Sequence, residues 1–147
     1  MQVLLDGLAA TERFGARIAG RLLPGDVIAL NGGLGAGKST LARAIIAALG
    51  YAGEVPSPSF AIIQTYDPPG ISLPVVHADF YRIDDPGQGA ELGLDDYRQG
   101  AVLIAEWPQH VGGFLQEAGC LSITLESLAA GRVAIVEPGA DWLSRLP

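Results

Sequence analysis

Apolar residues follow two different spacings along this chain. Residues 26–30 and 101–106 are short and nearly unbroken apolar runs, a pattern typical of strands that are buried on both faces of a sheet. From Phe14 to Leu22, large apolar residues recur every four positions, which predicts a helix over residues 9–23 with one apolar face. A second helix is predicted over residues 39–49. Strands and helices therefore alternate in this part of the chain.

Further strands are predicted at both ends and in the middle of the chain, over residues 1–5, 60–66, 74–79, 120–125 and 132–137. The first is expected at a sheet edge, and the last two are expected to form a hairpin-like antiparallel pair. Between residues 83 and 98 the chain is polar and should form a loop with short helical pieces. A short helix is predicted around Trp142.

Composition and charge limit the class of protein. With 147 residues, 49% of them hydrophobic, the chain fits one compact domain over residues 1–147. No apolar run is long enough to span a membrane and no charged-then-apolar leader opens the chain, so we expect a cytoplasmic protein without a membrane partner. The lone cysteine, Cys120, falls in a predicted strand, where a buried thiol is expected.

The formal net charge is −7, and the nine basic residues are scattered rather than clustered. A protein that holds RNA by its phosphates needs a basic face. Any role with nucleic acid is therefore expected to be indirect, through a partner protein.

The most informative motif follows the strand at residues 26–30. Residues 32–39, with the sequence GGLGAGKS, match the phosphate-binding pattern G-x-x-x-x-G-K-[ST] and lead directly into the predicted helix. Glycines let backbone N–H groups turn toward phosphate oxygens, a lysine reaches the β- and γ-phosphates, and the serine hydroxyl binds Mg²⁺. The sequence therefore predicts a nucleoside triphosphate site with Mg²⁺. Its expected binding residues are Gly33, Leu34, Gly35, Ala36, Gly37, Lys38, Ser39 and Thr40.

This motif and the order of the elements predict an α/β fold. The expected architecture is a single P-loop NTPase domain, with a mostly parallel central sheet flanked by helices and a C-terminal antiparallel strand pair.

Phosphate chemistry with a metal needs a carboxylate opposite Ser39, at the carboxyl end of a neighbouring strand. Asp79 and Glu106 both stand at such strand ends. Glu106 follows the cleaner apolar run and is the favoured Mg²⁺ partner, with Asp79 as the alternative. His77 and Tyr81 alternate with Asp79 and would share one face with it, which makes a joint polar site plausible.

These residues together resemble the TsaE family, the bacterial ATPases needed to make threonylcarbamoyladenosine in tRNA. The similarity rests on the phosphate-binding loop and on four further segments that follow it in order along the chain: SPSF at residues 57–60, HADFYR at 77–82, LGLDDY at 92–97 and IAEW at 104–107. The loop is generic, whereas the HADFYR segment followed by a strand that ends in Glu-Trp is much more specific.

The resemblance implies a Mg-dependent ATPase, slow without partners, that acts on a complex of TsaD and TsaB rather than on tRNA directly. ATP and Mg²⁺ would be held by the loop, with Ser39 and Glu106 at the metal and Lys38, Asp79 and Glu106 in catalysis. Ser57 and Ser59 would form a switch-like segment. Thr11 and Arg132 are implied as nucleotide contacts, and Trp107 is implied to lie near the nucleotide or the partner surface. The chain departs from the family pattern at Gly33, where Asp is usual, and at Ser59, where Thr is usual.

A GTPase of the usual kind is excluded, because its Asn-Lys-x-Asp loop needs a second lysine and the chain has only Lys38. Two other functions are compatible with the same phosphate-binding loop. A small-molecule kinase remains possible, with Arg82 and Arg98 in a lid. A nucleotide-dependent interaction module without significant turnover is also possible. Of the eight arginines, only Arg82 is expected near the site from the residues alone, so no arginine finger is evident.

Overall fold

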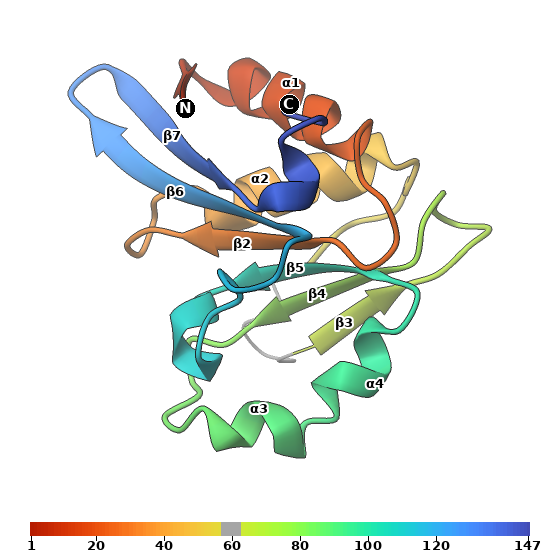
Figure 1. Cartoon of the computed structure of the whole chain (residues 1–147). Helices are drawn as coiled ribbons and strands as arrows, with labels where there is room; N and C mark the ends of the chain where they lie inside the picture. Colours follow the sequence, from red (N-terminus) through yellow and green to blue (C-terminus); the bar gives the residue numbers. More distant parts are fainter. Residues whose placement is uncertain (57–62) are drawn as a thin grey trace.

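The computed structural model describes residues 1–56 and 63–147. The strands of these residues are β1 (Gln2–Leu5), β2 (Val27–Asn31), β3 (Ile63–Tyr66), β4 (Val75–Asp79), β5 (Val102–Glu106), β6 (Cys120–Leu128) and β7 (Gly131–Pro138). They form one seven-stranded sheet in the order β1-β7-β6-β2-β5-β4-β3 (Figure 1). The predicted strand over residues 60–66 is therefore described only from Ile63 onward.

The helices are α1 (Leu8–Ala19), α2 (Lys38–Ala48), α3 (Gly87–Glu91) and α4 (Leu94–Arg98), with two 3₁₀ turns, η1 (Pro108–Val111) and η2 (Ala140–Trp142). Both long helices lie where the spacing of apolar residues predicts them. The first ends at Ala19, four residues before the predicted limit. Short helices α3 and α4 confirm the helical pieces expected in the polar segment, and η2 confirms the short helix expected around Trp142.

The prediction of a mostly parallel sheet is wrong, because the sheet is mixed. Parallel pairing joins only β6 to β2, β2 to β5 and β5 to β4, whereas β1–β7, β7–β6 and β4–β3 are antiparallel. Short connections explain two of the antiparallel pairs, β7–β6 and β4–β3, since consecutive strands joined by a short turn pair antiparallel. The third pair joins the two ends of the chain, because β1 lies beside β7 at the edge of the sheet. The predicted hairpin of the last two strands is confirmed.

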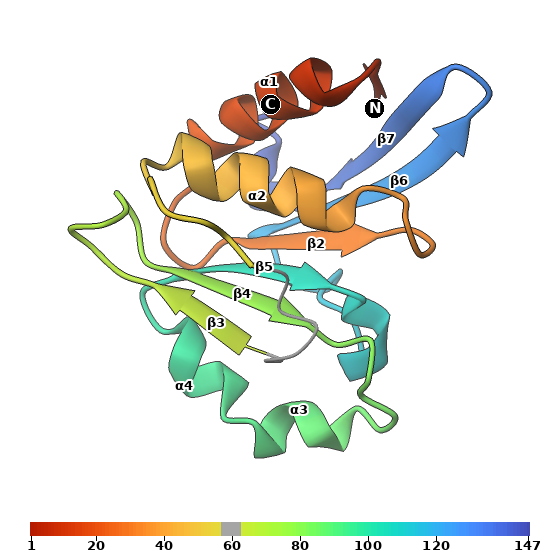
Figure 2. The same cartoon turned by 180° about the vertical axis from the view of Figure 1, so that it is seen from behind.

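Side chains of the central strands alternate between two cores, one on each face of the sheet. Ile28 and Leu30 of β2 pack in the core under α1 and α2, whereas Val27 and Ala29 pack in a second core with Leu94 of α4. Figure 2 shows α1 and α2 together on one side of the sheet and α3 and α4 on the other. This double coverage explains why β2 and β5 are apolar at almost every position.

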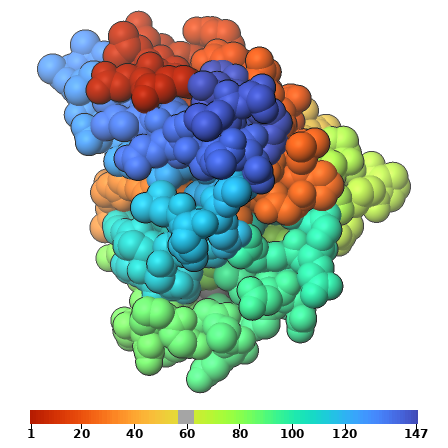
Figure 3. All heavy atoms as spheres, viewed as in Figure 1, coloured from red at the N-terminus to blue at the C-terminus, as the bar shows by residue number. Residues whose placement is uncertain are grey.

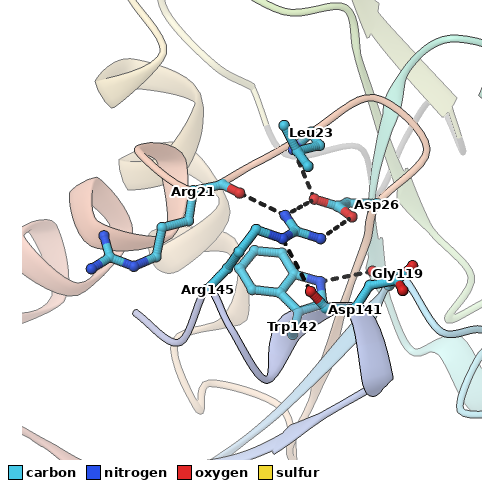
Figure 4. A network of polar contacts seen from close by, with 7 residues as sticks. All are labelled: Arg21, Leu23, Asp26, Gly119, Asp141, Trp142 and Arg145. Carbon is cyan, nitrogen blue, oxygen red and sulfur yellow. Dashed lines mark hydrogen bonds and ion pairs between the residues drawn. The ribbon is translucent and has the colours of Figure 1, made fainter.

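The C-terminal segment closes against the amino end of β2. The Arg145 guanidinium donates to both carboxylate oxygens of Asp26, at 2.7 and 3.0 Å, and lies 4.3 Å from the ring centre of Trp142 (Figure 4). Trp142 is fully buried, and its Nε1 donates to the carbonyl oxygen of Gly119. In Figure 3 the deep-blue C-terminal residues lie against the red N-terminal segment. These contacts lie at the end of the strands opposite the predicted site.

Within the described residues, no helix is long and apolar enough to cross a membrane.

Candidate functional site

Most of the predicted site residues that the structure describes gather where three parallel strands end. β2, β5 and β4 are adjacent and parallel, so Asn31, Glu106 and Asp79 finish at one edge of the sheet, next to the amino end of α2. A cavity of about 260 Å³ opens there. It is lined by Leu34, Gly35, Ala36, Gly37, Lys38, Ser39, Thr40, Arg43, Asp79, Glu106, Trp107 and Arg132. Ligands of open α/β sheets bind at this kind of edge.

The loop between β2 and α2 depends on glycine at two positions. Gly32 has a φ of 140°, and a Cβ atom there would lie 2.7 Å from the carbonyl oxygen of Leu125. Gly37 has a φ of 104° and caps α2, and its Cβ would lie 2.7 Å from the Arg132 guanidinium. Any other residue would be strained at both positions, since an L side chain rarely adopts these angles. The loop therefore presents backbone rather than side chains at the positive end of the α2 dipole.

Lys38 is the first residue of α2 and is buried, with only 5% of its surface exposed. Its Nζ atom donates to the carbonyl oxygens of Gly32 and Gly33, at 2.6 and 2.8 Å. Burial lowers the pKa of Lys38, while the negative charges of Glu106 and Asp79 act in the opposite direction. The side chain is thus a cation held inside the cavity, where an anion would interact with it strongly.

Ser39 and Glu106 meet through a direct hydrogen bond. Ser39 Oγ donates to Glu106 Oε1 at 2.9 Å, although the two residues lie 67 positions apart in the chain. The second oxygen, Oε2, lies 2.7 Å from Nε2 of His77. Glu106 and His77 are both almost completely buried. The structure therefore brings together the hydroxyl and the carboxylate that the sequence favoured as a metal pair.

Asp79 stands beside Glu106, because these two residues are paired in the β4–β5 register. Its Oδ1 accepts a hydrogen bond from the backbone N–H of Tyr81 at 2.9 Å, which turns the chain as β4 ends. Tyr81 consequently leaves the strand and is 47% exposed, so it does not share the buried face of His77 and Asp79 as the alternation predicted. Asp79 lines the cavity together with Glu106.

Trp107 forms one wall of the cavity. It has a left-handed backbone (φ 57°, ψ 50°), the one positive φ of a non-glycine residue among the described positions. Non-glycine residues in this region cost about 1–3 kcal/mol and cluster at functional sites. The Trp107 ring lies against Tyr81 and His110, with centroid distances of 5.0 and 5.4 Å. His110 Nδ1 also lies within hydrogen-bond distance of the Phe80 carbonyl oxygen.

A second cavity, of about 510 Å³, adjoins the first and shares Thr40 and Arg132 with it. Its other lining residues come from the end of β1, the start of α1 and the tip of the β6–β7 hairpin. They are Leu5, Gly7, Leu8, Thr11, Ser127, Leu128 and Gly131. Thr11 is buried in this wall and donates to the carbonyl oxygen of Gly7. Arg132 Nη2 donates to the carbonyl oxygen of Gly35 at 3.3 Å, so this arginine connects the hairpin to the loop.

This chain is similar to known proteins over most of its length. The family model described as "Threonylcarbamoyl adenosine biosynthesis protein TsaE" matches residues 5–134. The chain belongs to the TsaE family. Its relatives include the tRNA threonylcarbamoyladenosine biosynthesis protein TsaE of Haemophilus influenzae, 35% identical over 115 residues that cover 74% of this chain and 72% of the relative.

The protein of the same name from Streptomyces coelicolor is 39% identical over 97 residues, which cover 65% of this chain and 66% of the relative. Among solved structures, the fold is similar to YdiB of Bacillus subtilis, with a TM-score of 0.72 and 27% identity. That match covers 92% of this chain and 83% of the other. The family is one of threonylcarbamoyladenosine biosynthesis, and this part of the TsaE resemblance is confirmed.

The arginines that line the cavity are not the ones expected from the residues alone. Arg82 was the arginine expected near the site from the residues alone, but the cavity is lined by Arg43 and Arg132. Arg43 lies four residues after Ser39 on α2, so helical periodicity placed it on the same face and could have revealed it. Arg132 comes from β7, and only the TsaE resemblance pointed to it. Arg98, the other arginine considered for a lid, is paired with Glu117.

Leu34 and Gly33 are two loop residues that the sequence assigned to the nucleotide site. Leu34 is 74% exposed at the tip of the loop, so it lines the cavity mouth rather than its interior. Ser57 and Ser59 lie outside the described residues. Gly33 departs from the TsaE pattern, and a Cβ atom there would meet nothing within 4 Å. A side chain at position 33 would therefore begin in open space, so close packing around the Cβ position does not explain the glycine.

Proposed function

We propose that this protein binds ATP with Mg²⁺ in the cavity at the amino end of α2 and hydrolyses it slowly. The observation that carries the proposal is the 2.9 Å hydrogen bond between Ser39 Oγ and Glu106 Oε1, next to the buried ammonium group of Lys38. Two hard oxygen donors and one cation thus converge on the mouth of a glycine-rich loop. A triphosphate bound together with a metal ion needs this combination of groups.

The donor set fits Mg²⁺ better than a metal held by protein alone. Within residues 1–56 and 63–147, no three His, Cys, Asp or Glu side chains gather into a metal-binding group. Mg²⁺ is usually held by one or two protein oxygens and completes its coordination with phosphate and water. Ser39 and Glu106 would supply the protein ligands. When bound, the ion would neutralise charge on the phosphate oxygens.

The remaining residues of the cavity have distinct roles in this proposal. Lys38 would exchange its two carbonyl partners for phosphate oxygens, which are stronger acceptors because they are charged. Asp79 would orient the attacking water, since its carboxylate lines the cavity beside the metal pair. Thr11, Thr40 and Arg132 would contact the base and sugar in the second cavity. Trp107 would cover the phosphate groups of the bound nucleotide.

The site is tested by binding of ATP to wild type and to Lys38→Ala, measured by titration calorimetry with Mg²⁺ present. No other lysine can replace the lost charge, so affinity should fall at least tenfold, which corresponds to about 1.4 kcal/mol or more. Leu115→Ala is the control, because this exposed leucine lines neither cavity and its truncation should leave affinity within about threefold. Unchanged affinity of Lys38→Ala would contradict the site.

We further propose that ATP turnover serves tRNA threonylcarbamoyladenosine synthesis through a complex of TsaD and TsaB. Membership of the TsaE family supports the pathway. The charge of −7 and the lack of a basic cluster in the sequence support contact with a protein complex rather than with tRNA itself. Depletion of the protein should lower threonylcarbamoyladenosine in tRNA, read by mass spectrometry, and wild type should restore it whereas Lys38→Ala should not. A normal level of the modified nucleoside after depletion would overturn the assignment.

A further inference from the structure

His77 contacts Glu106, the candidate metal ligand, on the carboxylate oxygen that does not face Ser39. Its side chain is fully buried, and Nε2 lies 2.7 Å from Glu106 Oε2, while the other carboxylate oxygen faces Ser39. Each oxygen of Glu106 therefore has its own partner on a different element: His77 on β4 and Ser39 on α2. Since β4 and β5 are paired in parallel, the sheet itself holds the imidazole beside the carboxylate.

The direction of this hydrogen bond follows from the chemistry of the pair. A carboxylate can only accept, so Nε2 of His77 must carry the proton and donate it. The other ring nitrogen, Nδ1, is buried and has no hydrogen-bond partner among the described residues. Within that part of the chain, the contact with Glu106 is therefore the polar interaction that compensates the burial of the ring. Burying an imidazole is costly unless such a hydrogen bond is made.

We propose that His77 is a positioning residue that sets the metal affinity of the site by holding the carboxylate of Glu106. The terminal torsion of glutamate has no sharp preferred angle, so an unsupported carboxylate samples many orientations. The bond to Oε2 fixes this torsion and keeps Oε1 directed at Ser39 Oγ. Partners of this kind behind a metal ligand typically change metal affinity by 10- to 100-fold. The inference rests on the proposed Mg²⁺–nucleotide site.

Three substitutions of His77 separate positioning from packing. Glutamine carries its amide nitrogen at about the reach of Nε2, so His77→Gln can still donate to Glu106. Asparagine is equally polar but shorter, and its amide corresponds in position to the partnerless Nδ1 rather than to Nε2. Leucine is close to histidine in volume and has no donor. His77→Asn keeps the test available if His77→Leu fails to fold.

The measurement is binding of a fluorescent ADP derivative, titrated with MgCl₂ and repeated in EDTA. For His77→Asn and His77→Leu we expect the half-saturating Mg²⁺ concentration to rise 10- to 100-fold, with binding in EDTA unchanged. His77→Gln should stay within about threefold of wild type. Thermal unfolding of each variant verifies that the fold is intact.

Wild-type Mg²⁺ dependence in a folded His77→Asn or His77→Leu variant would overturn the positioning role and leave the nucleotide site standing. An equal rise of the half-saturating Mg²⁺ concentration in His77→Gln and His77→Asn would also overturn it. A general packing defect would affect both variants alike, because it does not depend on how far the donor reaches. A wild-type protein that binds the probe without any response to Mg²⁺ would overturn the proposed metal site itself, and this inference with it.

Discussion

The ammonium nitrogen of Lys38 lies 4.3 Å from the centre of the Trp107 ring. This contact joins the glycine-rich loop to the residue that follows β5, two segments that sequence order separates widely. A cation over an aromatic face contributes about 0.5–2 kcal/mol, depending on how far it is removed from water. Lys38 thus has two kinds of partner inside the protein, the loop carbonyls and an indole ring, and a bound phosphate would compete with both.

Trp107 should therefore report nucleotide binding by its fluorescence. Withdrawal of the Lys38 cation from the ring changes the field around the indole, so we expect emission to change in intensity or wavelength when ATP and Mg²⁺ are added. The chain has one other tryptophan, Trp142, buried beside Arg145 at the opposite end of the strands. Trp107→Phe should lose the response and Trp142→Phe should keep it. A response that survives in Trp107→Phe would contradict this prediction.

Asp79 and Glu106 should respond differently to neutral isosteric substitution. Asp79→Asn keeps an oxygen that can accept from the Tyr81 N–H, so the turn after β4 should persist. We expect nucleotide binding within about threefold of wild type and a fall in ATP hydrolysis of about 10²-fold or more, as for the loss of a positioned base. Glu106→Gln should instead weaken the Mg²⁺ dependence of binding. If binding is lost in Asp79→Asn and retained in Glu106→Gln, the two roles must be exchanged.

Arg145→Ala should destabilise the fold without affecting the nucleotide site. The substitution leaves the Asp26 carboxylate, which is only 4% exposed, without its two guanidinium hydrogen bonds. We expect the free energy of unfolding to fall by about 1.5–3 kcal/mol, measured by urea denaturation. Arg145→Lys keeps the charge but not the paired geometry, and should show a smaller loss. An unchanged urea midpoint in Arg145→Ala would show that the C-terminal contacts contribute nothing to stability.

Cys120 should resist thiol reagents in the native protein. Burial raises the pKa of its thiol from 9.0 to about 11. The negative charge of Glu117 adds a smaller increase, and the positive charge of Arg98 acts in the opposite direction. At pH 8 the reactive thiolate is therefore scarce, and labelling should be slow in buffer and complete in urea. Rapid labelling of the folded protein at pH 8 would contradict the burial of this side chain.

The same shift predicts a dependence of stability on pH. Because the folded state holds the Cys120 proton more tightly than the unfolded chain does, the stabilisation is complete below pH 9 and is lost as the pH rises toward about 11. Burial also raises the pKa of Tyr66, which acts in the same direction. The contribution of the thiol is measured by urea denaturation between pH 9 and about pH 11. It is the difference in the free energy of unfolding between wild type and Cys120→Ala. Parallel profiles for the two proteins would contradict it.

Residues close in sequence were the ones that could be predicted best. Every residue of the loop from Gly33 to Thr40 follows from one local pattern, and Glu106 follows from the end of one apolar run. The Ser39–Glu106 and His77–Glu106 contacts span 67 and 29 positions. No local spacing predicts such pairs, because they depend on which strands become neighbours. Arg132 reaches Gly35 across 97 positions for the same reason.

The sequence by itself determined where the helices and strands lie, the form of the glycine-rich loop and its ionic groups. These features arise from hydrogen bonds and side-chain periodicities within a few residues, so the local pattern is sufficient. Only the tertiary structure decided the directions of β1 and β3, the position of β5 between β2 and β4, and hence the pairing of Glu106 with Ser39 and His77. Strand order depends on how distant segments bury their apolar faces together, and many local patterns are compatible with more than one order.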